Sequence, residues 1–168
     1  RKRKVSYDLP AMNIDHQLVL RPAHRSEAAA IASMSRLQVE YGLKWRWTPT
    51  RIRRAIDDKE TMVLVASIDG ALEGFAVMKF RDEDAHLLLL AVQPKARRGG
   101  IGRAMLNWLE KSCRTAGIRH VRLEVRVSNR PARRFYENQG YRLVSQVAGY
   151  YEENEAAAVM AKSLLAGR

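Results

Sequence analysis

The sequence predicts an α/β (α+β) domain with about seven strands and about four helices. Two observations support this fold class. Short apolar runs typical of strands recur along the chain, and between them lie segments whose apolar residues are three and four positions apart, as on the buried side of a helix. In the middle of the chain, turn sequences at 69–71 and 81–84 separate three successive strand candidates, which predicts that these strands pair antiparallel.

The first third of the chain predicts one strand followed by two helices. Residues 18–22 form a short apolar run ended by a proline, and the Ala-rich segment 26–41 has helical spacing up to Gly42, which is placed to end the helix. The apolar residues expected on the buried side of this helix are Ile31, Met34, Leu37, Val39 and Tyr41. A second helix follows, with a cap at Thr48 or Thr50.

The rest of the chain predicts six further strands and two further helices. The strands are expected at 62–68, 72–80, 86–92, 121–127, 141–149 and 156–164, and the helices at 101–116 and 130–139. Asn129 is placed to cap the last helix, and Pro131 lies in its first turn, where a missing amide costs nothing. The last two strands are expected to be joined by residues 150–155.

A basic, glycine-rich loop lies between the strand that ends at Val92 and the helix that begins at Ile101. The first amides of a helix have no partner within the helix, and the helix dipole is positive at this end, so a bulky anion can bind there. Arg97, Arg98 and Arg103 add full positive charges. The loop lacks the Gly-Lys-Ser/Thr of a P-loop and the spacing of a dinucleotide-binding loop. A pyrophosphate group is the ligand that we expect to bind at this loop.

Composition predicts one globular domain. The chain has 168 residues, of which 46% are apolar and 29% charged. Residues 16–168 are expected to form the domain, after a basic and flexible tail at residues 1–15. The absence of a long apolar stretch or a signal-like segment gives no support to membrane insertion or secretion. The single Cys113 is expected to be a core thiol, so the predicted location is cytoplasmic.

The anion loop and a second segment together resemble the GNAT superfamily of acetyl-CoA-dependent N-acetyltransferases. Arg97, Gly100 and Gly102 match the R/Q-x-x-G-x-G/A signature of that superfamily. Residues 124–141, EVRVSNRPARRFYENQGY, are similar to its second motif, with the same spacing between the asparagine, alanine, tyrosine and glycine. The order of strands and helices is also the same. Within the superfamily, about residues 60–162 resemble the RimI-type ribosomal-protein N-terminal alanine acetyltransferases.

This resemblance implies a GNAT fold, in which a central, mixed and mostly antiparallel sheet binds acetyl-CoA in the cleft after the fourth strand. The residues implied to bind the cofactor are Leu90, Ala91, Val92, Arg97, Arg98, Gly99, Gly100, Ile101, Gly102, Arg103 and Asn129. Glu124 is implied to deprotonate the amine through water, and Tyr136 to protonate the departing thiolate, as the amine attacks directly in a ternary complex.

Each of these catalytic roles has an alternative. His86, at the start of the fourth strand, is a rival base, because an unperturbed histidine titrates near neutrality. Glu124 could instead be a solvated carboxylate paired with Arg122 or Arg126. Tyr136 could be an aromatic side chain with a packing role only. No His, Cys or Asp spacing supports a metal site.

Four aromatic residues are candidates for contact with the acceptor amine. Trp45 and Trp47 lie in the loop between the first two helices, where they could equally form a hydrophobic plug over the core. Tyr150 and Tyr151 form a pair between the last two strands, and paired aromatic residues can hold a peptide backbone by packing and hydroxyl hydrogen bonds.

The predicted function is that of an acyltransferase that moves an acetyl group to a primary amine, with a protein or peptide N-terminal α-amine as the expected acceptor. A small-molecule amine fits the motifs equally well, because fold and cofactor do not determine the acceptor. The net charge of +12 also raises a non-catalytic nucleic-acid-binding or ribosome-binding module as an alternative. No RNA-binding signature supports it, so nucleic acid is not an expected partner. Both a monomer and a homodimer remain open.

Overall fold

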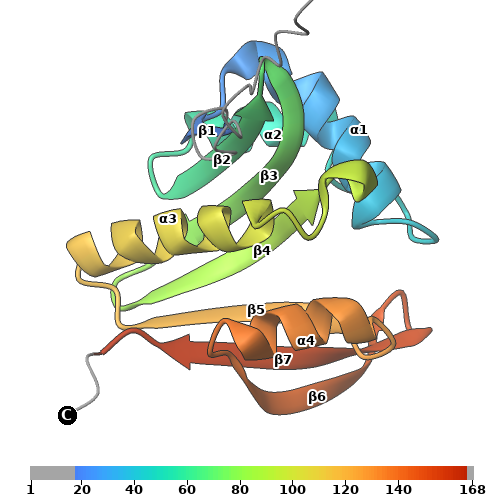
Figure 1. The fold of residues 1–168 in the computed structure, drawn as a ribbon. Coiled ribbons are helices and arrows are strands. Elements are labelled where there is room, and N and C mark those ends of the chain that lie inside the picture. The colour runs from blue at the N-terminus through green and yellow to red at the C-terminus, as the bar shows by residue number, and fades with distance from the viewer. Residues whose placement is uncertain (1–17, 166–168) are drawn as a thin grey trace, which may run out of the picture.

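The structure, a computed structural model, describes residues 18–165, so the expected tail at residues 1–15 lies outside the described residues. In this part of the chain seven strands form one mixed sheet in the order β1-β2-β3-β4-β5-β7-β6 (Figure 1). Neighbouring strands run antiparallel except β4 and β5, which run parallel. The fold class predicted from the sequence is confirmed.

The helices and strands lie close to their predicted positions, with two exceptions described below. The strands are β1 (Leu18–Pro22), β2 (Thr61–Ile68), β3 (Ala71–Phe80), β4 (Asp84–Val92), β5 (His120–Arg126), β6 (Arg142–Tyr151) and β7 (Glu155–Ser163). The α-helices are α1 (Ala28–Gln38), α2 (Pro49–Asp57), α3 (Ile101–Thr115) and α4 (Arg130–Asn138), with short 3₁₀ turns η2 (Arg25–Glu27) and η3 (Pro94–Ala96). As predicted, Thr48 caps α2 and Asn129 caps α4, each through a side-chain oxygen that accepts a backbone amide.

The sheet separates two hydrophobic cores. On one face α3 and α4 pack against the sheet, and on the other face α1 and α2 do so (Figure 1). Alternate residues of β3 enter alternate cores: Met78 packs with α3, and Phe75 packs with α1 and α2. Because both faces of β2 and β3 are covered, these strands are almost continuously apolar. No helix within residues 18–165 is long and apolar enough to cross a membrane.

The first helix is shorter than the 26–41 predicted, because a buried carboxylate redirects the chain. Helix α1 ends at Gln38, and Gly42, which has a positive φ of 73°, follows several residues later. Glu40 turns inward, where its carboxylate accepts hydrogen bonds from the Ser35 hydroxyl and from the backbone amides of Arg46 and Trp47. The residues predicted to be buried but found exposed are Leu37 (65% exposed) and Tyr41 (49%).

The last hairpin also differs from its prediction. Strand β6 continues through Tyr151, so the tyrosine pair lies at the end of a strand and the turn consists of residues 152–154. Glu152 and Glu153 take positive φ angles of 52° and 64° in this turn. Strand β6 is at the edge of the sheet, and its residues from 142 to 150 are exposed.

Strands β4 and β5 diverge part of the way along their length. They pair from Asp84 and His120 as far as Leu87 and Leu123, and beyond that point no pairing joins the described residues of the two strands. At the same place the register between β3 and β4 shifts so that Leu88 has no partner in β3, which is a β-bulge. The bulge bends β4 away from β5, and a cleft opens between them.

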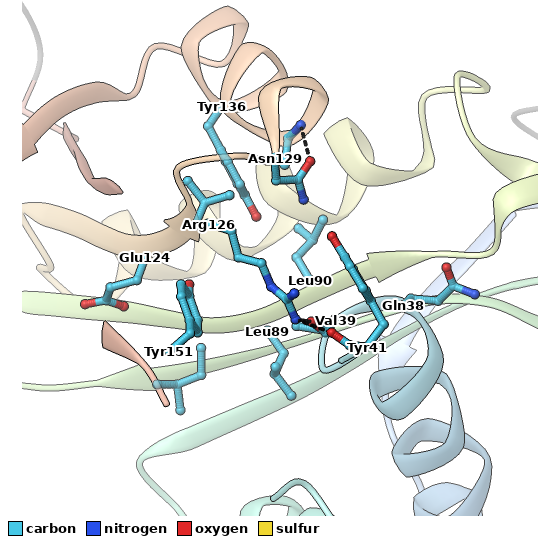
Figure 2. Close-up of a pocket in the computed structure, with 13 residues that line it drawn as sticks. Gln38, Val39, Tyr41, Leu89, Leu90, Glu124, Arg126, Asn129, Tyr136 and Tyr151 are labelled. Carbon is cyan, nitrogen blue, oxygen red and sulfur yellow. Dashed lines mark hydrogen bonds between the residues drawn. The ribbon is translucent and has the colours of Figure 1, made fainter. Parts of the chain in front are cut away.

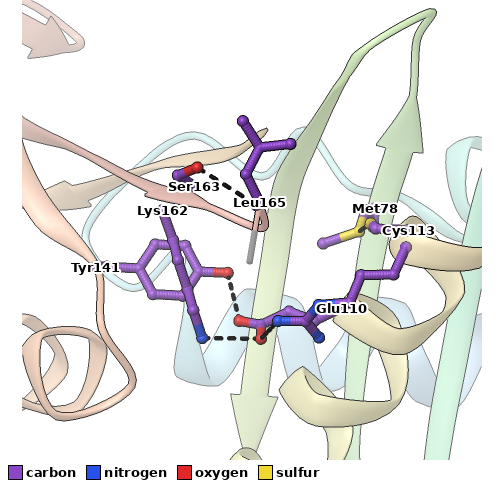
Figure 3. A network of polar contacts seen from close by, with 8 residues as sticks. Met78, Glu110, Cys113, Tyr141, Lys162, Ser163 and Leu165 are labelled. Carbon is purple, nitrogen blue, oxygen red and sulfur yellow. Dashed lines mark hydrogen bonds and ion pairs between the residues drawn. The ribbon is translucent and has the colours of Figure 1, made fainter. Parts of the chain in front are cut away.

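A buried ionic group ties α3 to the second half of the sheet (Figure 3). The Glu110 carboxylate accepts hydrogen bonds from the Tyr141 hydroxyl at 3.0 Å and from Lys162 Nζ at 2.9 Å. Only 3% of the Glu110 side chain is exposed, whereas Lys162 is 22% exposed. One turn along α3, Cys113 is fully buried, as predicted, and burial raises its pKa to about 11.

We expect Lys162→Met to lower the free energy of unfolding by about 1–3 kcal/mol, because it removes the nearer cation from the buried Glu110 carboxylate and leaves only Arg114, whose Nη2 is 3.9 Å away. Urea denaturation would measure the change. Lys111→Met, which removes an exposed lysine from the same helix, should leave the midpoint nearly unchanged. Equal midpoints for both variants would show that the ion pair contributes no net stability.

Candidate active site

The cleft between the diverging strands holds a pocket of about 100 Å³ (Figure 2). Its walls come from β4, β5, α4, the end of α1 and the end of β6. The lining residues are Gln38, Val39, Tyr41, Leu88, Leu89, Leu90, Glu124, Val125, Arg126, Asn129, Ala132, Tyr136 and Tyr151. The pocket therefore joins β4, which leads into the anion loop, and the second motif segment to a wall from the first third of the chain.

The anion loop has the geometry expected for a helix-terminal anion site. Ala104 donates the first helical hydrogen bond of α3, to Gly100, so the amides of residues 101–103 precede it without intrahelical partners. Gly100 has a φ of 84°, a left-handed conformation that glycine adopts at no steric cost. Arg98, in the same conformation, and Arg103 are exposed beside this helix end. Amides without helical partners and two exposed arginines therefore lie together at one helix end, which suits an anion such as a diphosphate.

Two residues of the loop have contacts that the sequence did not indicate. A Cβ added to Gly102 would lie 3.3 Å from Phe135 of α4, so this glycine allows α3 and α4 to pack closely. The Arg97 guanidinium does not point to the helix terminus: its Nη2 donates to Gln38 Oε1 at 2.9 Å and its Nε to the Val92 carbonyl at 3.1 Å. In this structure the Arg97 side chain links the loop to α1.

Three of the residues that the resemblance implies to bind the cofactor lie on β4 beyond the bulge. Leu90, Ala91 and Val92 pair with β3 on one side. Their other side has no strand partner among the described residues, since β5 has diverged. Leu90 lines the pocket, whereas the Ala91 side chain is buried in the core. The open edge of β4 offers backbone hydrogen-bonding groups to a ligand in the cleft.

Helix α4 brings Asn129 and Tyr136 to the pocket from above β4. The Asn129 side-chain oxygen accepts the Ala132 amide at 3.2 Å and is thereby engaged in capping the helix. The Tyr136 ring packs edge to face against Phe135 and Tyr141, with ring centres 5.1 and 5.7 Å away, and its hydroxyl points into the pocket (Figure 2). Burial raises the pKa of the Tyr136 phenol, so the group stays protonated at neutral pH and can serve as a proton donor.

The two rival bases are in direct contact. His86 Nε2 lies 2.5 Å from Glu124 Oε2, because β4 and β5 still pair at this level. Arg122 Nη2 lies 3.5 Å from the other imidazole nitrogen, Nδ1, and its Nη1 lies 3.6 Å from Glu124 Oε1. Because an arginine can only donate, the neutral tautomer that satisfies both contacts accepts from Arg122 at Nδ1 and donates from Nε2 to Glu124. The two residues form one polar group at the end of the pocket.

The predicted acceptor-side aromatic residues divide into two groups. Trp45 and Trp47 pack against the α1 and α2 core beneath the Arg36 and Arg51 guanidinium groups, 5.1 and 3.9 Å from the ring centres, and neither lines the pocket. The two tryptophans therefore cover the hydrophobic core, which the sequence also allowed as the alternative to contact with the acceptor amine.

The tyrosine pair lies on the same side of the pocket as Glu124 (Figure 2). Tyr151 lines it, and Tyr150 packs edge to face against Tyr151 with ring centres 4.9 Å apart. Burial raises the pKa values of both phenols, and the nearby Glu124 charge adds to the effect. Sequence reasoning missed Gln38 and Tyr41 as pocket residues, because it placed them within a longer helix.

Comparison with known proteins agrees with this geometry. The profile of the acetyltransferase (GNAT) family matches residues 18–141. An uncharacterized N-acetyltransferase of Methanocaldococcus jannaschii is 41% identical over 99 residues, which cover 58% of this chain and 64% of that protein. The ribosomal protein bS18-alanine N-acetyltransferase of Escherichia coli is 33% identical over 96 residues, covering 55% of this chain and 65% of that enzyme. The matched segments thus span slightly less than two thirds of these relatives.

A solved structure extends the similarity over most of the fold. The crystal structure of Ard1 from Thermoplasma volcanium has a TM-score of 0.79 and 25% sequence identity, and it covers 89% of this chain and 99% of that one. The family profile spans the anion loop as well as the diverging strands and α4, which together provide most of the residues that line the pocket. The chain belongs to the acetyltransferase (GNAT) family.

Proposed function

We propose that this chain is an N-acetyltransferase that transfers the acetyl group of acetyl-CoA to the N-terminal α-amine of a protein or peptide. The observation that carries the proposal is the placement of a carboxylate and a protonated phenol at one pocket: Glu124, bonded to His86, at one end and the Tyr136 hydroxyl above the centre. Acetylation of an amine needs these two groups, one to accept a proton and one to donate it.

The cleft fits acetyl-CoA, which would supply the acetyl group as an activated thioester. The free amides at the start of α3, with Arg98 and Arg103, would hold the pyrophosphate. The open edge of β4 at Leu90 and the Asn129 amide would hold the pantetheine arm. Since the Asn129 oxygen caps α4, its amide nitrogen is the group left to donate.

The chain's own residues would move two protons during the transfer. Glu124 would accept a proton from the acceptor amine through water, while His86 holds the carboxylate in place. The amine nitrogen forms a bond to the acetyl carbon as the carbon–sulfur bond breaks. Tyr136 would give its proton to the departing thiolate. An α-amine has a pKa near 8, against about 10.4 for lysine, so a carboxylate suffices as base for the former.

A peptide acceptor is supported by the aromatic groups around the pocket and by the named relatives. Tyr41 and Tyr151 lie on either side of the Arg126 guanidinium and present rings and hydroxyl groups to a backbone (Figure 2). The relative from Escherichia coli is named for the N-terminal alanine of a ribosomal protein.

Incubation with acetyl-CoA and matched acceptors would test the proposal. The acceptors are peptides with a free α-amine, the same peptides with a blocked α-amine and an internal lysine, and small primary amines, with mass spectrometry to locate the acetyl group. We expect modification of the free α-amine. Acetyl groups only on lysine side chains, or only on small amines, would refute the proposal. The acceptor would then be the lysine side chain or the small amine that carries the acetyl group.

Binding of acetyl-CoA at α3 gives a separate expectation. Gly100→Asp places a negative charge at the helix terminus, and we expect it to weaken acetyl-CoA binding at least about 10-fold in calorimetry. Gly100→Ala is the matched control, since it introduces the strain of a φ of 84° without the charge. Undiminished affinity in Gly100→Asp would place the diphosphate elsewhere.

A further inference from the structure

One arginine connects the catalytic strand to the segment that follows α1. Arg126 is the last residue of β5 and lies two positions beyond Glu124, on the same side of the strand. Its Nη2 donates to the backbone carbonyls of Val39 at 3.0 Å and Tyr41 at 2.7 Å. These contacts cross the cleft between residues that are 85 or more positions apart in the chain.

The Arg126 guanidinium is held from several directions. The Tyr41 ring lies 4.1 Å from its Cζ atom, and Glu155 Oε2 lies 3.6 Å from its Nη1. Glu155 is held in turn by the Ser128 hydroxyl. Only 11% of the Arg126 side chain is exposed, so water competes little for its hydrogen bonds.

The segment that Arg126 contacts continues into a loop, and a further hydrogen bond joins this loop to the far side of the cleft. Within the loop, the Glu40 carboxylate accepts the amides of Arg46 and Trp47. At its outer edge, the Lys44 amide donates to Glu152 Oε1 at 2.6 Å, in the turn between β6 and β7. Residues 39–48 therefore have anchors on β5 and on the β6–β7 turn, and Val39 and Tyr41 of this segment line the pocket.

We infer that Arg126 is a positioning residue for the acceptor, which fixes residues 39–41 as a preformed wall of the acceptor site. The inference rests on the proposed function in naming a peptide as the acceptor. Without the two hydrogen bonds, a peptide that binds must order this wall itself, and the ordering cost reduces its affinity. The proposed acetyl-CoA site lies at the anion loop and β4, to which Arg126 makes no hydrogen bond, so we expect the affinity for acetyl-CoA to change much less than that for the peptide.

The first measurement is steady-state kinetics of Arg126→Gln, with Arg126→Lys and Arg142→Gln alongside. For Arg126→Gln, we expect the KM for the peptide to rise about 10- to 100-fold, because two charged hydrogen bonds are lost. The KM for acetyl-CoA should stay within about twofold of the wild-type value. Arg126→Lys keeps the charge and can reach one carbonyl, so it should fall between wild type and Arg126→Gln. Arg142→Gln removes an exposed arginine of β6 and should match wild type. An equal rise in both KM values would overturn the selective role.

The second measurement is hydrogen exchange, which needs no turnover. The amides of Lys44, Arg46 and Trp47 are bonded to carboxylates, so their exchange rates report opening of the loop. In Arg126→Gln these amides should exchange faster, while β2 and β3 stay protected. Unchanged exchange at 39–48 would overturn the inference. A wild-type protein that acetylates no peptide would instead refute the proposed function, and the exchange result would still decide the role of Arg126.

Discussion

Glu124→Gln is expected to slow acetylation of an N-terminal peptide about 10²- to 10⁴-fold at neutral pH, with the fold and acetyl-CoA affinity retained. The amide keeps the size of the carboxylate and still accepts a hydrogen bond from His86, but it cannot take a proton from the amine. The rate should recover toward alkaline pH, because an α-amine loses its proton unaided above about pH 8 and then needs no base. Rates at saturating acetyl-CoA across the pH range would measure both effects.

The contact between Glu124 and His86 changes what their single variants can show. His86→Ala should slow the reaction by a smaller factor, about 10-fold, because it removes the group that orients the carboxylate and leaves the base itself. If the two residues act as a unit, the double variant should be no slower than Glu124→Gln alone. A fully active Glu124→Gln together with an inactive His86→Ala would make the histidine the base.

Tyr136→Phe is expected to lower kcat by about 10²- to 10⁴-fold with little change in acetyl-CoA binding. The substitution keeps the ring contacts with Phe135 and Tyr141 and removes only the hydroxyl that points into the pocket. An interaction needed only as the thiolate departs should affect kcat and leave the affinity for the ground state unchanged. Stopped-flow or thiol-release assays would provide kcat, and calorimetry the affinity.

A matched variant separates chemistry from packing. Tyr141→Phe removes a neighbouring phenol whose hydroxyl bonds to Glu110, outside the pocket. It should reduce stability by about 1 kcal/mol and leave kcat near the wild-type value. If Tyr136→Phe turns over as fast as Tyr141→Phe, the Tyr136 hydroxyl donates no proton and the residue has a packing role only.

Much of the fold follows from short-range features of the sequence. The turn residues at 69–71 and 81–84 predict the β2–β3–β4 meander, which the structure contains. Asn129 caps α4 as predicted, since a cap needs only an amide three residues later. The first helix was predicted too long, because helical periodicity cannot register that Glu40 is bonded by amides further along the chain.

Motif spacing and helix geometry depend on near neighbours, so the residue order was enough to indicate the family, the helix that begins at the anion loop and the candidates Glu124 and Tyr136. Which of these residues meet depends on how the strands and helices pack. His86 and Glu124 are 38 positions apart and touch because β4 and β5 pair as far as Leu87. The contact of Arg126 with Tyr41 joins residues 85 positions apart. Such contacts depend on strand order, the bulge at Leu88 and the packing of α1, and no local pattern of residues encodes them.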